Sequence, residues 1–161
     1  MTVISVDKDY DALTVVIVAE LAAPRERVWE LWADPRQLER WWGPPTHPAS
    51  FERNELAAGA ESAYTMTGPD GRTSRGWWRI TVADAPARLE FVDGWATPDG
   101  TPITDPASTT TVEVELTEHD GRTRMVVRST FDSRDQLDEL DGLGAIEIFA
   151  GTIGRMDALL T

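Results

Sequence analysis

Residues 23–45 read APRERVWELWADPRQLERWWGPP and combine the start and stop signals of two short helices. Pro24 suits the first helical position, because its φ is fixed and it has no N–H to satisfy. Asp34-Pro35 repeats the signal with an N-cap carboxylate and a proline directly after it. Gly43 and the prolines after it end the second helix, since Pro cannot continue a helix. We therefore expect two consecutive short helices in this segment.

Segments typical of β-strands flank the helical pair. Residues 13–20 precede it and are short and β-branched, which indicates one strand. The strands expected after it are 49–54, 61–67, 73–83, 88–93, 109–117 and 122–131. Asp70-Gly71 and Asp120-Gly121 are expected hairpin turns, because Asp and Gly accept the positive φ that tight turns require. Alternating apolar residues predict a seven-stranded antiparallel sheet with one buried face.

The last segment has a helical pattern. Ser133 and Gln136 form a capping box at its start. The apolar positions are spaced by three and four residues and form one stripe; they are Ile146, Phe149, Ile153, Met156 and Leu160. Four glycines are costly in a helix and predict either a kink near 142–144 or a close approach of the backbone to another part of the structure. Residues 94–108 are too rich in Gly and Pro for a strand and form a long loop, and whether it acts as a lid is left open.

Composition excludes several classes of protein. The 161 residues suggest a single domain over 1–161, with its core in 13–160. The net charge of −13 argues against nucleic-acid and anionic-membrane partners. No Cys is present, so thiolate chemistry and Cys-ligated metals are excluded. No secretory signal or membrane-length apolar run is visible, so we expect a cytoplasmic protein without membrane insertion.

Several motifs occur in an order that resembles one known family. The motifs are Ala23-Pro24, Val28-Trp29, Asp34-Pro35 and Trp41-Trp42-Gly43-Pro44, then Asp70-Gly71, Gly76-x-Trp78 and Pro86-x-Arg88-Leu89-x-Phe91, and last Gly144, Gly151 and Gly154 before Leu160. They resemble the START-like (SRPBCC) superfamily, and most of all the family named for the activator of the 90-kDa heat-shock chaperone's ATPase. The resemblance covers residues 13–160.

The resemblance implies an α+β helix-grip fold, in which a curved antiparallel sheet wraps around a long C-terminal helix. Eukaryotic members carry this domain behind a separate chaperone-binding domain. Stand-alone bacterial members are mostly described only as small-molecule-binding or as uncharacterised proteins, and relatives in the superfamily include lipid carriers, cyclases and aromatic-ring hydroxylase domains. Fold alone therefore assigns no chemistry.

The seven Trp residues divide into core and pocket candidates. We expect both Trp41 and Trp42 to pack the helical pair on the sheet, although one indole could instead close a cavity mouth. Alternation places Trp78 inward and Trp77 outward and exposed. A ligand pocket between the sheet and the last helix is expected to be lined by Tyr64, Met66, Trp78, Phe91, Trp95, Phe149 and Ile153. The alternative is a dry, closed core.

The common catalytic signatures are absent, and no catalytic or metal-ligating residue is expected. His47 and His119 are expected to be solvated. Arg75, Arg79 and other arginines are expected on the outer face, although one turned inward could hold a ligand carboxylate. We predict binding of a small hydrophobic or aromatic ligand, without a cofactor. The alternatives are a co-chaperone-like stimulator of a chaperone ATPase and an enzyme of the cyclase or dehydratase type. A homodimer or a chaperone partner is left open.

Overall fold

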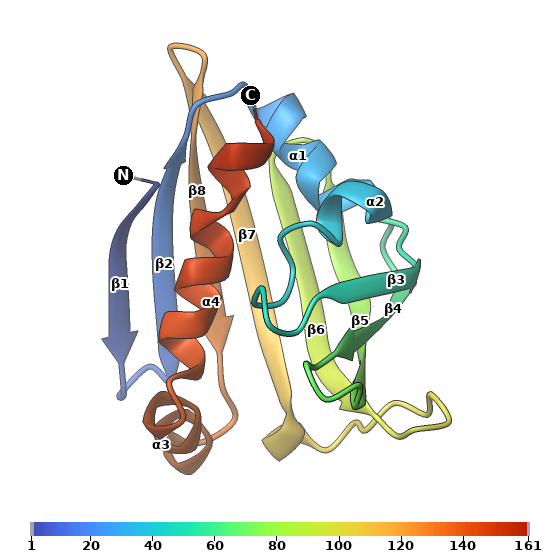
Figure 1. Cartoon of the computed structure of the whole chain (residues 1–161). Coiled ribbons are helices and arrows are strands. Elements are labelled where there is room, and N and C mark those ends of the chain that lie inside the picture. The colour runs from blue at the N-terminus through green and yellow to red at the C-terminus, as the bar shows by residue number, and fades with distance from the viewer. Residues whose placement is uncertain (1, 161) are drawn as a thin grey trace.

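In a computed structural model that describes residues 2–160, one antiparallel sheet curves around the C-terminal helical segment (Figure 1). The strands are β1 Val3–Asp9, β2 Thr14–Leu21, β3 Ala49–Arg53, β4 Glu61–Thr67, β5 Thr73–Asp84, β6 Arg88–Ala96, β7 Thr109–His119 and β8 Arg122–Thr130. The helices are α1 Arg25–Ala33, α2 Pro35–Leu38, α3 Arg134–Gly142 and α4 Ala145–Gly154, with short 3-10 turns at Pro106–Ser108 and Met156–Leu159. This arrangement confirms the predicted helix-grip fold.

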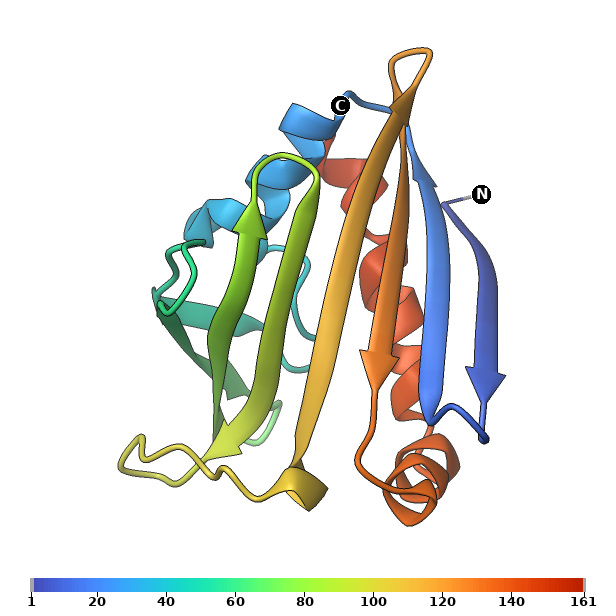
Figure 2. The same cartoon turned by 180° about the vertical axis from the view of Figure 1, so that it is seen from behind.

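The eight strands lie in the order β1-β2-β8-β7-β6-β5-β4-β3, and every neighbouring pair is antiparallel. Viewed from behind, the outer face of the sheet carries no helix (Figure 2). The inner face holds α4, while α1 packs on β7 and β8. The helices and the inner face together enclose the core.

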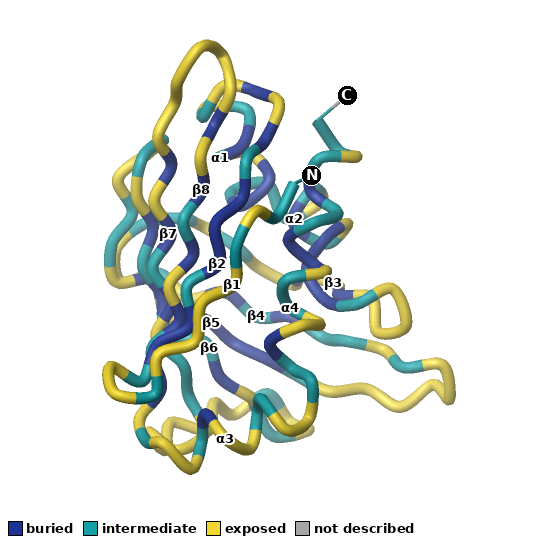
Figure 3. The backbone as a smooth tube through the Cα atoms, turned by 90° about the vertical axis from the view of Figure 1, so that its left-hand side faces the viewer, coloured by how far each residue is buried: buried dark blue, intermediate teal, exposed yellow. Residues whose placement is uncertain are grey.

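The predicted number of seven strands is wrong, because β1 adds an eighth at the sheet edge. Most of its residues are exposed (Figure 3), and Asp7, Lys8 and Asp9 make it look like an acidic tail in the sequence. An edge strand has a partner on one side only, so it tolerates charged residues that a central strand would exclude. None of the helices within residues 2–160 is long and apolar enough to span a membrane.

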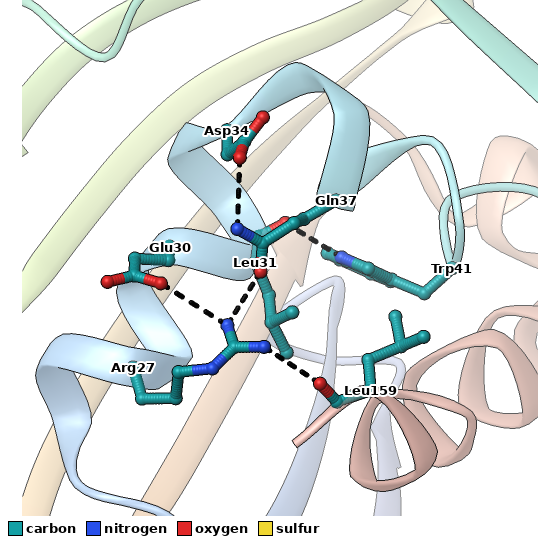
Figure 4. A network of polar contacts seen from close by, with 7 residues as sticks. All are labelled: Arg27, Glu30, Leu31, Asp34, Gln37, Trp41 and Leu159. Carbon is teal, nitrogen blue, oxygen red and sulfur yellow. Dashed lines mark hydrogen bonds and ion pairs between the residues drawn. The ribbon is translucent and has the colours of Figure 1, made fainter. Parts of the chain in front are cut away.

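A capping contact fixes the start of α2 as the sequence predicts. The Asp34 carboxylate accepts a hydrogen bond from the backbone N–H of Arg36 at 2.9 Å. Pro24 is the N-cap of α1 and not its first helical residue, so α1 begins one residue later than predicted. The guanidinium group of Arg27 donates to the Gln37 side chain at 2.6 Å and to the Leu159 carbonyl at 2.8 Å (Figure 4). These bonds connect both helices to the end of the chain.

The predicted kink near 142–144 is a complete break between α3 and α4. Gly144 adopts φ 74°, a left-handed conformation that side chains with a Cβ rarely accept. The break lets α3 turn across the end of the sheet while α4 runs along its inner face (Figure 1).

Trp77 corrects one prediction about the outer face. Its side chain lies on that face but is only 6% exposed, so the expected exposed indole is wrong. Gly94 on β6 provides the space, because a Cβ there would lie 2.9 Å from the indole. The indole N–H donates to the carbonyl oxygen of Trp95 at 2.9 Å. β6 also continues to Ala96, so the loop that was predicted from residue 94 begins three residues later.

Candidate functional site

A cavity of about 400 Å³ lies between the inner face of the sheet and α4. Its wall is mainly apolar, and five aromatic side chains contribute to it. These are Trp42, Tyr64, Trp95, Phe131 and Phe149. Small or hydroxyl-bearing residues complete the wall; they include Gly43, Ser74, Thr110, Ser129 and Thr152. Short side chains at these positions leave the space that larger residues would fill.

A hydrogen-bonded pair, Tyr64 and Asp93, lies in this wall. The Tyr64 hydroxyl donates to Oδ1 of Asp93 at 2.9 Å, from β4 across β5 to β6. Gly76 lies between them on β5, and a Cβ at that position would collide with the Tyr64 ring. The absent side chain at residue 76 therefore allows the tyrosine to reach the aspartate.

The surroundings of Asp93 raise the pKa of its carboxyl group, so the group keeps its proton up to nearly neutral pH. Burial raises the pKa of Asp93 to about 7, against the lowering effect of the Tyr64 hydroxyl, the Trp78 indole N–H and the Gly94 backbone N–H. Burial, and then the neighbouring Asp93, raises the pKa of Tyr64 well above its usual value, so this hydroxyl stays a donor.

The residues predicted for a ligand pocket separate into two groups. Tyr64, Met66, Trp95 and Phe149 line the cavity. Trp78, Phe91 and Ile153 do not line it; each is fully buried in the core. The rings of Trp78 and Phe91 stack with centroids 4.1 Å apart, so these side chains fill the core and do not border the cavity. That a ligand contacts the first group stays a prediction.

Trp41 and Trp42 have different environments, although they are adjacent. Trp41 is fully buried, and its indole N–H donates to the Leu31 carbonyl at 2.8 Å (Figure 4), as expected for a packing role. Trp42 packs on the core and also lines the cavity, with its ring 5.8 Å from that of Phe149. The alternative for this motif, that one indole closes a cavity mouth, stays a prediction for Trp42.

Sequence reasoning missed Asp93, an acidic side chain in the cavity wall. The signal was present, because Phe91, Asp93 and Trp95 alternate along β6 and must share one face. An acid at an inward position of a strand is unusual and needs a partner or a function.

The other polar candidates have more ordinary surroundings. His47 is exposed and borders the cavity, while His119 is exposed near a turn. No Lys or Arg among the described residues lines the cavity. Arg75 instead pairs with Glu52 at 3.6 Å, and Arg124 with Glu20 at 3.3 Å. Within residues 2–160 no cluster of three or more His, Asp or Glu side chains is placed to hold a metal ion.

A curved antiparallel sheet, a C-terminal helix held in its concave face and a cavity between them define a protein of the helix-grip class. The family model described as Activator of Hsp90 ATPase homolog 1-like protein matches residues 22–160. The chain belongs to this family, which confirms the resemblance found in the sequence.

Solved structures of bacterial proteins support the same assignment. A protein from Arthrobacter aurescens is 50% identical, with TM-score 0.93 over 99% of this chain and 92% of that chain. A protein from Mycobacterium smegmatis is 45% identical, with TM-score 0.87 over 99% of this chain and 97% of that chain. The AHSA1 protein from Silicibacter pomeroyi is 18% identical, with TM-score 0.73 over 91% and 96% of the two chains, and shares the fold. The comparison with curated proteins gives no match.

Proposed function

We propose that the protein binds a small hydrophobic or aromatic molecule in the cavity between the sheet and α4. The observation that carries this proposal is a cavity of about 400 Å³ with a mainly apolar wall and one convergent polar pair. Ligand sites in proteins combine these features, because apolar walls provide affinity and a few polar groups fix orientation. The volume suits a molecule of two or three fused rings.

Thermal unfolding in the presence of apolar and aromatic compounds tests this proposal. A ligand that binds only the folded protein raises the melting temperature, and the rise grows with the ratio of ligand concentration to dissociation constant. Ser129→Phe is the matched variant, because a ring at this position on β8 would occupy the cavity. Compounds that stabilise the wild type should stabilise this variant less. A chemically broad library that stabilises neither protein would contradict the proposal.

The cyclase or dehydratase alternative gains support from Asp93. Such an enzyme needs an ionisable group that faces the cavity, and a carboxyl group with a pKa of about 7 can accept or donate a proton at neutral pH. Asp93 is then the general base, and Tyr64 holds the carboxylate in position through the hydrogen bond at 2.9 Å.

A simple proton-transfer reaction tests this second candidate without knowledge of the natural substrate. When a base removes the ring C–H proton of 5-nitrobenzisoxazole, the C–H electron pair forms a nitrile, the N–O bond breaks and a phenolate leaves. We expect the wild type to accelerate this ring opening and Asp93→Asn to lose the acceleration. Equal rates for the two proteins would show that Asp93 does not act as the base. The co-chaperone alternative stays a prediction, tested by the ATP turnover of a chaperone with added protein.

A further inference from the structure

The charge inside the cavity points to the chemistry of its ligand. Asp93 is the acidic side chain of the wall, and among the described residues no Lys or Arg lines the same space. In a poorly solvated site a carboxylate or phosphate head group would meet a like charge, whereas a cation would meet an opposite one. The net charge of −13 acts in the same direction at longer range.

The oxygens of Asp93 are hydrogen-bond acceptors when the group is ionised, so they also favour a cationic ligand that carries donors. Oδ1 accepts the Tyr64 hydroxyl at 2.9 Å, and the carboxylate has further acceptor capacity on its two oxygens. Thr110 lies opposite Asp93 on β7 and also lines the cavity wall. Two residues whose side chains carry acceptor oxygens therefore border one space, which matches an ammonium group with its three N–H donors.

Aromatic rings surround this space. Trp42, Tyr64, Trp95 and Phe149 line the cavity, and the Trp42 ring lies 6.0 Å from that of Tyr64. Aromatic faces attract cations and also pack well against flat apolar molecules. An apolar body with a cationic end therefore satisfies both parts of the wall.

We propose that the cavity selects an apolar amine, whose ammonium group binds the Asp93 carboxylate while the Tyr64 hydroxyl holds that carboxylate in place. This inference rests on the proposed function and specifies its ligand class. Fatty acids and phosphate esters are disfavoured by the same carboxylate. Neutral alcohols bind with intermediate affinity, because they donate one hydrogen bond without the charge.

Three probes with one apolar body and different head groups test the proposal. They are 2-(1-naphthyl)ethylamine, 2-(1-naphthyl)ethanol and 1-naphthylacetate. Isothermal titration calorimetry at about pH 8 measures each affinity, since the alkylammonium ion keeps its proton there and Asp93 is mainly ionised. We expect the amine to bind about ten- to a hundredfold more tightly than the carboxylate, as is typical of a hydrogen bond to a charged group.

Two variants assign the preference to Asp93. Asp93→Asn should bring the affinities of the three probes together, because the amide keeps the shape of the side chain and loses its charge. Asp84→Asn removes one negative charge from an exposed position on the same hairpin and should leave the ranking unchanged. The ranking in the wild type needs no variant, so a failure of Asp93→Asn to fold would not remove the test.

The outcomes separate this inference from the proposed function. If the carboxylate or the alcohol binds as tightly as the amine, the amine inference is wrong and the ligand cavity stands. If the amine preference survives in Asp93→Asn, its source is not this carboxylate and the inference is again wrong. If no probe binds, the inference fails together with the proposed function for ligands of this size.

Discussion

The space between the sheet and the helices has two ends that differ in how they are filled. At the end under α1 and α2, the inner face carries Trp78, Phe91 and other large side chains that are fully buried. At the end near α3, the same strands carry Ser74 on β5, Thr110 on β7 and Ser129 on β8. One sheet therefore builds a dense core and a cavity by a change in side-chain size along β5, β7 and β8.

This difference separates stability from binding within one fold. Large-to-small changes in a dense core cost the transfer free energy of the removed atoms and leave a cavity. Changes around a space that already exists remove little packing, so they affect a ligand more than the fold. The predictions that follow test this division, from the largest expected effect to the smallest.

Trp78→Ala tests the dense end. Trp78 is fully buried and stacked on Phe91, so its removal should lower the free energy of unfolding by about 3–5 kcal/mol. Chemical denaturation measures this loss. Trp95→Ala is the matched variant at the cavity end, where the indole is 49% exposed, and should cost much less. Equal losses of unfolding free energy at the two positions would contradict the proposed difference between the dense end and the cavity end.

Asp93→Asn tests the buried charge through pH. Because the folded-state pKa of about 7 lies above the ordinary value of 3.8, the folded protein holds a proton that the unfolded chain loses between these values. Asp93 therefore lowers stability as pH rises through this window, and the loss stays constant above about pH 7.

The variant removes this loss and keeps an oxygen that accepts the Tyr64 hydrogen bond. Relative to the wild type, we expect Asp93→Asn to gain stability from pH 4 to 7 and to level off at about 2–4 kcal/mol. Denaturation at several pH values measures the difference, with Asp84→Asn as the control. A difference that does not change with pH would show that Asp93 is normally ionised in the folded protein.

Gly76→Ala tests how the polar pair is built. The new Cβ would collide with the Tyr64 ring, so the ring must move and lose the hydrogen bond to Asp93. We expect a loss of about 1–3 kcal/mol, typical of overpacking. Gly151→Ala is the control, since nothing lies within 4 Å of that position on α4, and it should stabilise the helix by up to about 1 kcal/mol. Similar effects at both glycines would contradict this role of Gly76.

Thr110→Val tests the cavity end with the smallest change. The two side chains have nearly the same shape, and Thr110 is half-buried and lines the cavity, so stability should change by less than about 1 kcal/mol. Val114→Thr places a hydroxyl in the dense core on the same strand and should cost about 1–3 kcal/mol. A larger effect of Thr110→Val than of Val114→Thr would reverse the expected order.

Much of the fold could be predicted from local signals. The Asp34 cap, the hairpin glycines and the break at Gly144 act through backbone geometry, which neighbouring residues determine. β1 could not be predicted in the same way, because its stability comes from pairing with β2 and its own residues are mainly exposed. A strand at an edge carries little of the hydrophobic pattern that reveals central strands.

The site was harder to predict than the fold. Alternation placed Trp78 and Phe91 on the correct face, but position along the strand decides whether an inward side chain fills the core or borders the cavity. The burial of Trp77 depends on Gly94 of the next strand, and the Tyr64–Asp93 bond depends on Gly76 between them. Such contacts follow from strand register, which the sequence of one strand does not contain.

The central claim, a ligand cavity at the end of the sheet near α3, is tested most directly by NMR of the tryptophan indole N–H groups. The seven Trp residues report from both ends of the molecule. An apolar ligand, tested from a chemically broad set, should shift the signals of Trp42 and Trp95 saturably and leave that of Trp29, which does not line the cavity, nearly unchanged. If no compound shifts Trp42 and Trp95, or if Trp29 shifts equally, the account is contradicted.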